Sequence, residues 1–186
     1  MIYESRFWKD DLLKRAKFLR SKTVQKRWTE ISSGQLEQAV MLGFYTIRKL
    51  IEAKKLSDSM VNQNIEASAY TWRGQLVTRM NWLDIDKLYN LDSPQAVTKN
   101  LLFFCHQFVH SYVFVEFFND EHKLGGVFVS SDRERYQVLY FLEIDEIIRI
   151  FEQIGNDYPT NVVLTYSPKK QDYEVQSWVQ SVDNLG

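Results

Sequence analysis

The amino-acid sequence predicts an α+β fold, in which helices around a central buried helix are followed by a mostly antiparallel sheet with one further helix. Apolar residues recur at helical spacing up to about residue 111, and after it short runs of β-branched and aromatic residues alternate with turn residues. Helices followed by strands in this way are typical of α+β domains. We expect a single domain over 1–186, with a helical part of about 1–111 and a sheet-rich part of about 112–186.

Composition narrows the class of protein. The chain is 45% hydrophobic and 25% charged, which are ordinary values for a globular domain, and its 15% of aromatic residues predicts a core rich in rings. A net charge of −1 argues against a global basic field for nucleic acid but leaves a local basic patch open.

The sequence also predicts the cellular setting. Cys105 is the single cysteine and forms no disulfide within the chain, and the first residues lack the apolar segment of a signal peptide. No apolar run reaches the length of about 20 residues needed to cross a bilayer. We expect a protein of a bacterial-type cytoplasm without a membrane partner, and we leave its oligomeric state open.

A basic amphipathic helix is predicted over about 6–27. Its lysines and arginines allow two interpretations: a face that binds RNA or phosphate, or a solvated surface whose charges are paired with nearby acids. The near-neutral chain favours the second.

A second helix is predicted from the capping box formed by Ser32 and Gln35. Gly43 in its middle costs about 1 kcal/mol relative to alanine, which indicates that another helix approaches closely there. Arg48 and Lys49 lie off the apolar stripe, and either can face the central helix.

The middle of the chain predicts a β-hairpin over 62–82 that turns at Arg73-Gly74, and then a short helix over 83–91. The central helix is predicted to span Pro94–Ser111, with a helix cap at Asp92 or Ser93. Helical periodicity predicts a buried face made of Val97, Leu101, Phe104, Cys105, Phe108 and Val109, with Leu102 at its edge.

The second half of the chain predicts mainly strands. A strand from Tyr112 and two further strands over 126–132 and 136–144 suit an antiparallel meander. A helix is expected to follow from Asp145 to Gly155, and two more strands over 161–168 and 172–180.

The polar arc of the central helix is the candidate site. Its residues are Lys99, Asn100, Phe103, His106, Gln107, His110 and Ser111. His106 and His110 have the spacing of two zinc ligands, but Gln stands where a metalloprotease has its catalytic Glu, and Cys105 points about 100° away. We expect no metal. We also expect no cofactor, since the chain has no glycine-rich phosphate loop.

The central helix resembles the motif of HEPN (higher eukaryote and prokaryote nucleotide-binding) domains, many of which are metal-independent ribonucleases of bacterial toxins and phage defence. Their motif is Arg-x4–6-His on a long helix, and here Asn100 and Lys99 stand at that distance before His106. The resemblance covers residues 4–111 at most. It implies an endoribonuclease in which another residue, for example Arg48, neutralises the phosphate.

Two functions remain open on the sequence alone. The first is a non-enzymatic binding or accessory protein, whose partner is a protein or RNA. The second is a metal-independent endoribonuclease with His106, His110 and Asn100 as catalytic residues and Phe103, Lys99 and Arg48 as binding residues. In that function one imidazole takes a proton from a ribose 2′-hydroxyl, while Phe103 stacks a base. The binding function instead expects both histidines to be hydrogen-bonded at a helix–sheet junction, with Phe103 packed under the N-terminal helix.

Overall fold

The computed structural model describes residues 2–180 and confirms the α+β class. The helices are α1 Arg6–Lys22, α2 Glu30–Glu52, α3 Asp58–Val61, α4 Ile85–Leu88, α5 Leu101–Val109 and α6 Ile144–Asn156. The strands are β1 Asn64–Thr71, β2 Gln95–Asn100, β3 Ser111–Phe118, β4 Leu124–Ser131, β5 Val138–Glu143, β6 Asn161–Ser167 and β7 Asp172–Trp178.

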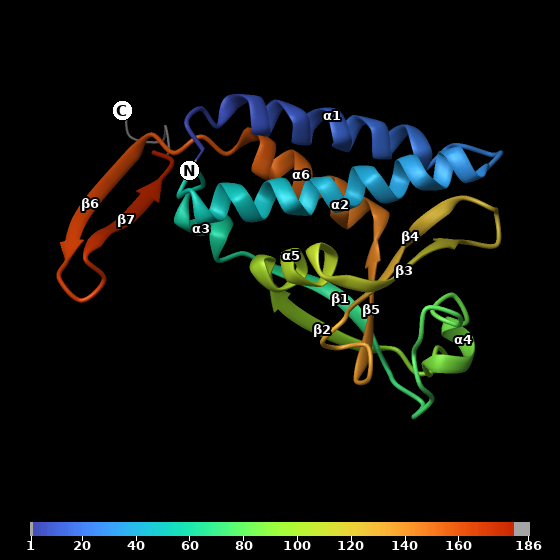
Figure 1. Ribbon diagram of the computed structural model, residues 1–186. Coiled ribbons are helices and arrows are strands. Elements are labelled where there is room, and N and C mark those ends of the chain that lie inside the picture. Colours follow the sequence, from blue (N-terminus) through green and yellow to red (C-terminus); the bar gives the residue numbers. More distant parts are fainter. Residues whose placement is uncertain (1, 181–186) are drawn as a thin grey trace.

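Five strands form one antiparallel sheet in the order β2-β1-β5-β4-β3. The predicted meander of β3, β4 and β5 is confirmed. β1 pairs with β5, with Ser68 opposite Phe141, so the sheet also takes two strands from the range expected to be mainly helical. α1, α2 and α6 lie together on one side, and α5 lies between α2 and the sheet (Figure 1).

The sheet is covered on both faces. Along β4, Val127 and Val129 belong to the large core beneath the helices, whereas Phe128 belongs to a smaller core with Leu88 and Tyr89. Because successive side chains of a strand point to opposite faces, the segment around α4 covers the second face. This explains why every residue of β4 except one is buried.

The predicted buried face of the central helix is confirmed from Leu101 to Phe108, whereas Val109 is half-buried and Val97 lies in β2. Leu101, Phe104, Cys105 and Phe108 have at most 1% of their surface exposed. The Phe108 ring stacks on Phe44 of α2 with 4.1 Å between centroids, so α5 is fixed against α2 through aromatic side chains.

The expected start of this helix at Pro94 is wrong. Residues 95–100 form β2, which pairs with β1 from Asn64↔Asn100 to Ala69↔Gln95. α5 begins at Leu101, because the side chain of Asn100 accepts a hydrogen bond from the backbone N–H of Phe103 at 2.8 Å and caps the helix there. Pro94 precedes an edge strand, a position that proline tolerates.

The predicted hairpin over 62–82 is also wrong in its second half. β1 exists, but its partners are β2 and β5, and residues 73–84 form turns instead of a strand. Gly74 does turn the chain, with φ of +87°. Beyond it Val77 is buried and anchors the loop over the smaller core.

The two N-terminal helices differ from expectation at their ends. α1 stops at Lys22 instead of residue 27. α2 begins at Glu30, since Thr29 Oγ1 accepts the N–H of Ser32 at 3.2 Å. The solvated interpretation of α1 receives support from ion pairs such as Arg20–Glu152 at 2.7 Å.

Lys9 departs from the expected charged surface of α1, because it is fully buried. Its Nζ donates to the carbonyl oxygen of Lys55 at 2.9 Å and to that of Asp157. Desolvation lowers the pKa of this amine, and the charge of Asp157 partly opposes the shift. The side chain therefore ties α1 to the segments that follow α2 and α6.

The last two strands, β6 and β7, are confirmed and form a separate two-stranded sheet. This hairpin extends away from the helices, with β6 as its outer strand (Figure 1). None of the helices within residues 2–180 combines the length and apolar character needed to cross a membrane.

Candidate functional site

A groove of about 510 Å³ lies where α2, α5 and the turn between β4 and β5 meet. α2 contributes Arg48. The other lining residues are Phe103, His106, Gln107 and His110 from α5, and Ser131, Asp132, Arg133 and Glu134 from the turn. We refer to this as the histidine groove.

Local structure of α5 sets the two imidazoles side by side. The Asn100 cap starts the helix, and the four-residue spacing brings His106 and His110 to one face, with 6.3 Å between ring centroids. Both side chains are exposed. The helix ends at His110, so the second imidazole stands beside the last turn of α5.

The β4–β5 turn is held against α5 by two hydrogen bonds. The buried Gln107 accepts the N–H of Ser131 at 2.9 Å, and the carbonyl of His110 accepts the N–H of Asp132 at 2.9 Å. Both hydrogen bonds join the backbone of the turn to the C-terminal end of α5. The charged residues of the turn are therefore held opposite the two histidines.

Arg48 is oriented toward His110. Its Nη1 lies 3.1 Å from His110 Nε2, and its Nε donates to Glu52 at 2.9 Å. A guanidinium has only donors, so Nε2 of His110 must accept. The contact therefore leaves this ring nitrogen engaged with Arg48.

His106 has an altered acid–base property. Partial desolvation lowers its pKa from the ordinary value, and the positive charge of Arg48 and the neighbouring His110 lower it further. The imidazole is therefore neutral at pH 7 and can accept a proton there.

The charges of the turn are only partly neutralised. Asp132 forms an ion pair with Arg135, and Glu134 accepts a hydrogen bond from Tyr140 at 2.8 Å. Arg133 is exposed and forms no ion pair with any residue that the structure describes. The guanidinium of Arg133 is therefore available at the groove to bind an anionic ligand.

The structure brings together four of the six predicted site residues. Arg48, Phe103, His106 and His110 line the histidine groove. Asn100 and Lys99 lie at the other end of α5, where Asn100 is occupied as the helix cap and Lys99 Nζ lies 5.4 Å from the Phe103 ring.

Sequence reasoning missed the β4–β5 turn and the role of Gln107. The available signal was the polar run SSDRER directly after a strand of small and apolar residues. Its position beside α5 follows only from the pairing of β4 with β3, which places Ser131 opposite Ser111 at the end of the helix.

The expectations attached to the binding function are met in part at these side chains. His110 is hydrogen-bonded to Arg48 where α5 meets the end of β4, whereas the imidazole of His106 has no partner among the described side chains, and both rings are exposed. Phe103 packs edge-on against Tyr140 of β5, with 5.2 Å between centroids, and not under the N-terminal helix. The polar arc therefore borders a groove.

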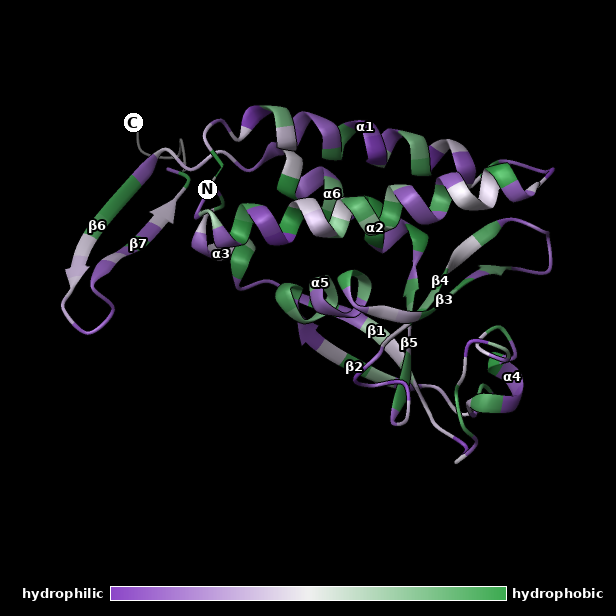
Figure 2. Cartoon of the chain, in the orientation of Figure 1, coloured by the Kyte–Doolittle hydropathy of each residue, from purple (hydrophilic) through white to green (hydrophobic). Residues whose placement is uncertain are grey.

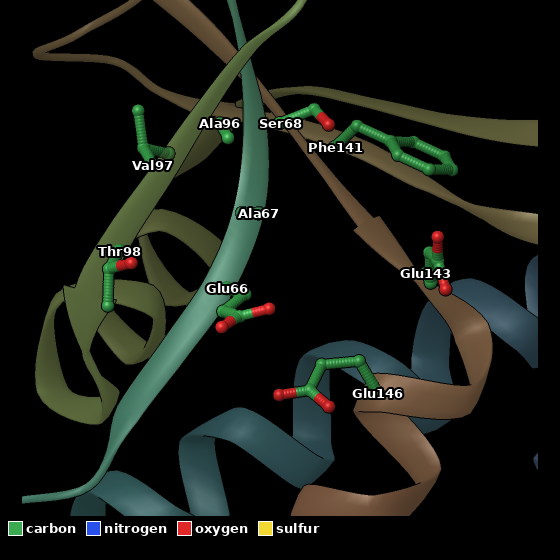
Figure 3. Close-up of a pocket in the computed structure, with 9 residues that line it drawn as sticks. All are labelled: Glu66, Ala67, Ser68, Ala96, Val97, Thr98, Phe141, Glu143 and Glu146. Atoms are coloured by element: carbon green, nitrogen blue, oxygen red, sulfur yellow. The ribbon is translucent and has the colours of Figure 1, made fainter.

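A second cavity of about 440 Å³ lies between β1, β2 and the start of α6. Figure 3 shows the carboxyl groups of Glu66 and Glu146 facing the same space, with the Phe141 ring at its border. Glu146 is paired with Arg149. Within residues 2–180 no group of three or more His, Cys, Asp or Glu side chains is placed to hold a metal ion.

With this geometry established, we compared the chain with known proteins: no protein-family model, no curated protein and no solved structure matches it.

Proposed function

We propose that the protein is a binding protein for RNA and that the histidine groove holds a phosphodiester and its neighbouring base. One observation carries this proposal: two arginines, two exposed imidazoles and a half-buried phenylalanine line a single groove. Charged and neutral hydrogen-bond donors can bind phosphate oxygens, and an aromatic ring can stack on an exposed base. The volume falls within the range of about 300–1,000 Å³ that is usual for ligand sites.

The lining carboxylates also fit single-stranded RNA. Asp132 and Glu134 are acceptors at the same groove in which Arg48 and Arg133 are donors. A groove with donors and acceptors can hydrogen-bond the edge of an exposed base, whereas duplex RNA presents mainly its backbone.

Binding of a labelled single-stranded RNA, followed by fluorescence anisotropy at several salt concentrations, tests the proposal. Arg133→Gln removes a charge-assisted hydrogen bond of about 1.5–3 kcal/mol, so we expect affinity to fall roughly 10-fold or more. The logarithm of the association constant falls with the logarithm of the salt concentration, and the variant should make this slope less steep by about 0.7, the value for one phosphate contact on a single strand.

Arg79→Gln is the matched control, because Arg79 is an exposed arginine that does not line the groove. Equal loss of affinity in both variants, or no binding by the wild type at low salt, contradicts the proposal.

The paired imidazoles favour a second function, the metal-independent cleavage of the bound RNA. The neutral His106 takes the proton of a ribose 2′-hydroxyl while the 2′-oxygen bonds to phosphorus and the bond from phosphorus to the 5′-oxygen breaks. Arg48 turns to the phosphate and releases His110 Nε2, and the imidazolium form of His110 protonates the leaving 5′-oxygen.

RNA degradation in the presence of a chelator tests this second function. His106→Ala and His110→Ala should each lower the rate by about 10²–10⁴-fold with little change in melting temperature, because both side chains are exposed. His122→Asn changes the remaining histidine outside the groove and should leave the rate unchanged. RNA that binds to the wild type but stays intact leaves binding as the function.

A further inference from the structure

The β6–β7 hairpin has an apolar face that the rest of the described chain leaves uncovered. In its register Val162, Leu164 and Tyr166 of β6 share one face with Tyr173 and Val175 of β7. Val162, Leu164, Tyr166 and Tyr173 are 54–60% exposed. Figure 2 shows the hydrophobic stretch of β6 on the arm that extends from the molecule.

The two edges of the hairpin differ. β7 is fixed to the body, since Ser177 donates from its N–H to Asp58 at 3.2 Å and from its hydroxyl to the carbonyl of Leu56 at 2.8 Å. β6 is the outer strand, and within residues 2–180 no further strand pairs with it.

Charge also distinguishes the two strands. β6 has the sequence NVVLTYS and carries no charge, whereas β7 carries Asp172 and Glu174. Five of the seven residues of β6 are exposed. Uncharged edge strands of β-branched and aromatic residues readily pair with other strands, and proteins usually block such edges with charges. A two-stranded hairpin alone is also only marginally stable in water.

We propose that β6 pairs antiparallel with β6 of a second copy of this chain, about a two-fold axis at Leu164. Leu164 then faces Leu164 of the second copy, and Val162 faces Tyr166 on the apolar side of the sheet. Pairs of aromatic and β-branched residues across two strands are favourable. The result is a four-stranded sheet in the order β7-β6-β6-β7.

We infer that the partner of β6 is a second copy of the chain for two reasons. β6 is complementary to itself, and the four-stranded sheet that forms has no uncharged edge strand left. After β6 has paired, the outer strands are the two copies of β7, which carry the carboxylates of Asp172 and Glu174 and are hydrogen-bonded to their own bodies through Ser177. The sheet therefore stops at two copies. Seven residues from each copy form a small interface compared with the roughly 20–30 of a standard one, so we expect a dimer that forms only at micromolar or higher concentration.

Sedimentation velocity of the full chain from about 2 to 200 μM tests for the dimer, and cysteine cross-linking locates it. In the proposed sheet the two copies of Leu164 have Cα atoms about 4.5–5.5 Å apart, within reach of a disulfide. The two copies of Val175 are three strand spacings apart, roughly 14 Å, which is too far.

We expect Leu164→Cys to give a covalent dimer under mild oxidation and Val175→Cys, on the same face, to give little. The native Cys105 is buried and does not interfere. Leu164→Lys places two like charges opposite each other and should keep the chain monomeric.

Three results would overturn the proposal. The first is a monomer at every concentration, and the second is equal cross-linking of the two cysteine variants, which indicates contact through the faces or through β7. The third is a dimer that persists in Leu164→Lys. Melting temperatures equal to that of the wild type confirm that each variant is folded.

Discussion

At the scale of single residues, the contact of Arg48 with His110 gives the two imidazoles of the groove different roles. His110 Nε2 is occupied by the guanidinium, while the imidazole of His106 has a lowered pKa and makes no hydrogen bond to another described side chain. The two histidines of α5 therefore differ in how freely their ring nitrogens can approach a phosphate.

The lowered pKa of His106 predicts the pH dependence of RNA binding. An imidazolium binds phosphate better than an imidazole does, so affinity should rise as the pH falls from 6.5 through the lowered pKa. Cleavage by the same residue should fall over this range, because the general base must be neutral. Anisotropy and cleavage rate measured between pH 5 and 8, the range in which histidine side chains titrate, check both directions.

His106→Ala is the control for this pH dependence, since it removes the titrating group from the exposed side of α5. If the variant keeps the full increase in affinity at low pH, then another group is responsible and the assigned role of His106 is wrong.

Part of the candidate site was predictable because it lies within one helix. The spacing of Phe103, His106 and His110 is a local property, and helical periodicity places them on one face. Arg133 and its turn were not predictable, because their place depends on which strands pair, and pairing is decided by contacts between distant parts of the chain.

At the scale of elements, the packing of α2 against α6 explains the glycine within α2. A Cβ on Gly43 would lie 2.1 Å from Cζ of Phe151, whose ring is buried and packs edge-on against Phe44. The prediction from sequence of a close approach at this glycine is confirmed.

Gly43→Ala should therefore destabilise the protein despite the better helix propensity of alanine. The gain is about 1 kcal/mol, and overpacking a full core costs about 1–3 kcal/mol, so we expect a net loss of up to roughly 2 kcal/mol. Denaturant unfolding measures it.

Gly34→Ala in the same helix is the matched control, since nothing lies within 4 Å of its new Cβ, and it should stabilise. Phe151→Leu combined with Gly43→Ala should recover part of the loss. Equal effects of alanine at both glycines would show that the ring moves freely.

The misprediction of β2 as the first part of the central helix has a physical cause. The run from Gln95 to Asn100 has a period that suits the start of a helix, but β1 pairs with it along its full length. The Asn100 cap then starts α5 at Leu101 instead of Pro94. β2 is an edge strand with mostly exposed side chains, so its sequence lacks the alternation that marks a half-buried strand. The strands of the meander, which contribute to the core, were predictable from their β-branched and aromatic residues.

At the scale of the whole molecule, the β6–β7 hairpin should be dispensable for folding of the rest. Its hydrogen bonds to the body come from Ser177, and two such bonds contribute about 1–3 kcal/mol. A chain that ends at Pro159 should keep one cooperative transition, with a melting temperature lower by roughly 2–12 °C.

Calorimetry of this shortened chain checks the prediction, and Ser177→Ala in the full chain should reproduce about half of the loss, because it removes the hydroxyl bond to Leu56 and keeps the backbone bond to Asp58. Loss of cooperative unfolding in the shortened chain would contradict the independence of the hairpin. The shortened chain should also sediment as a monomer at every concentration.

The pairing of α1 with α6 has a consequence for synthesis on the ribosome. α1 buries Leu12, Ala16 and Leu19 in the layer that it forms with α2 and α6, and about 120 residues separate Lys22 from Ile144. At a synthesis rate of about 5–20 residues per second, the apolar stripe of α1 remains without this partner for roughly 6–25 s. Contacts of such long range also slow folding after release. A nascent chain that stalls before α6 therefore exposes α1 as a ready target for chaperones, and translation speed through the meander sets how long that exposure lasts.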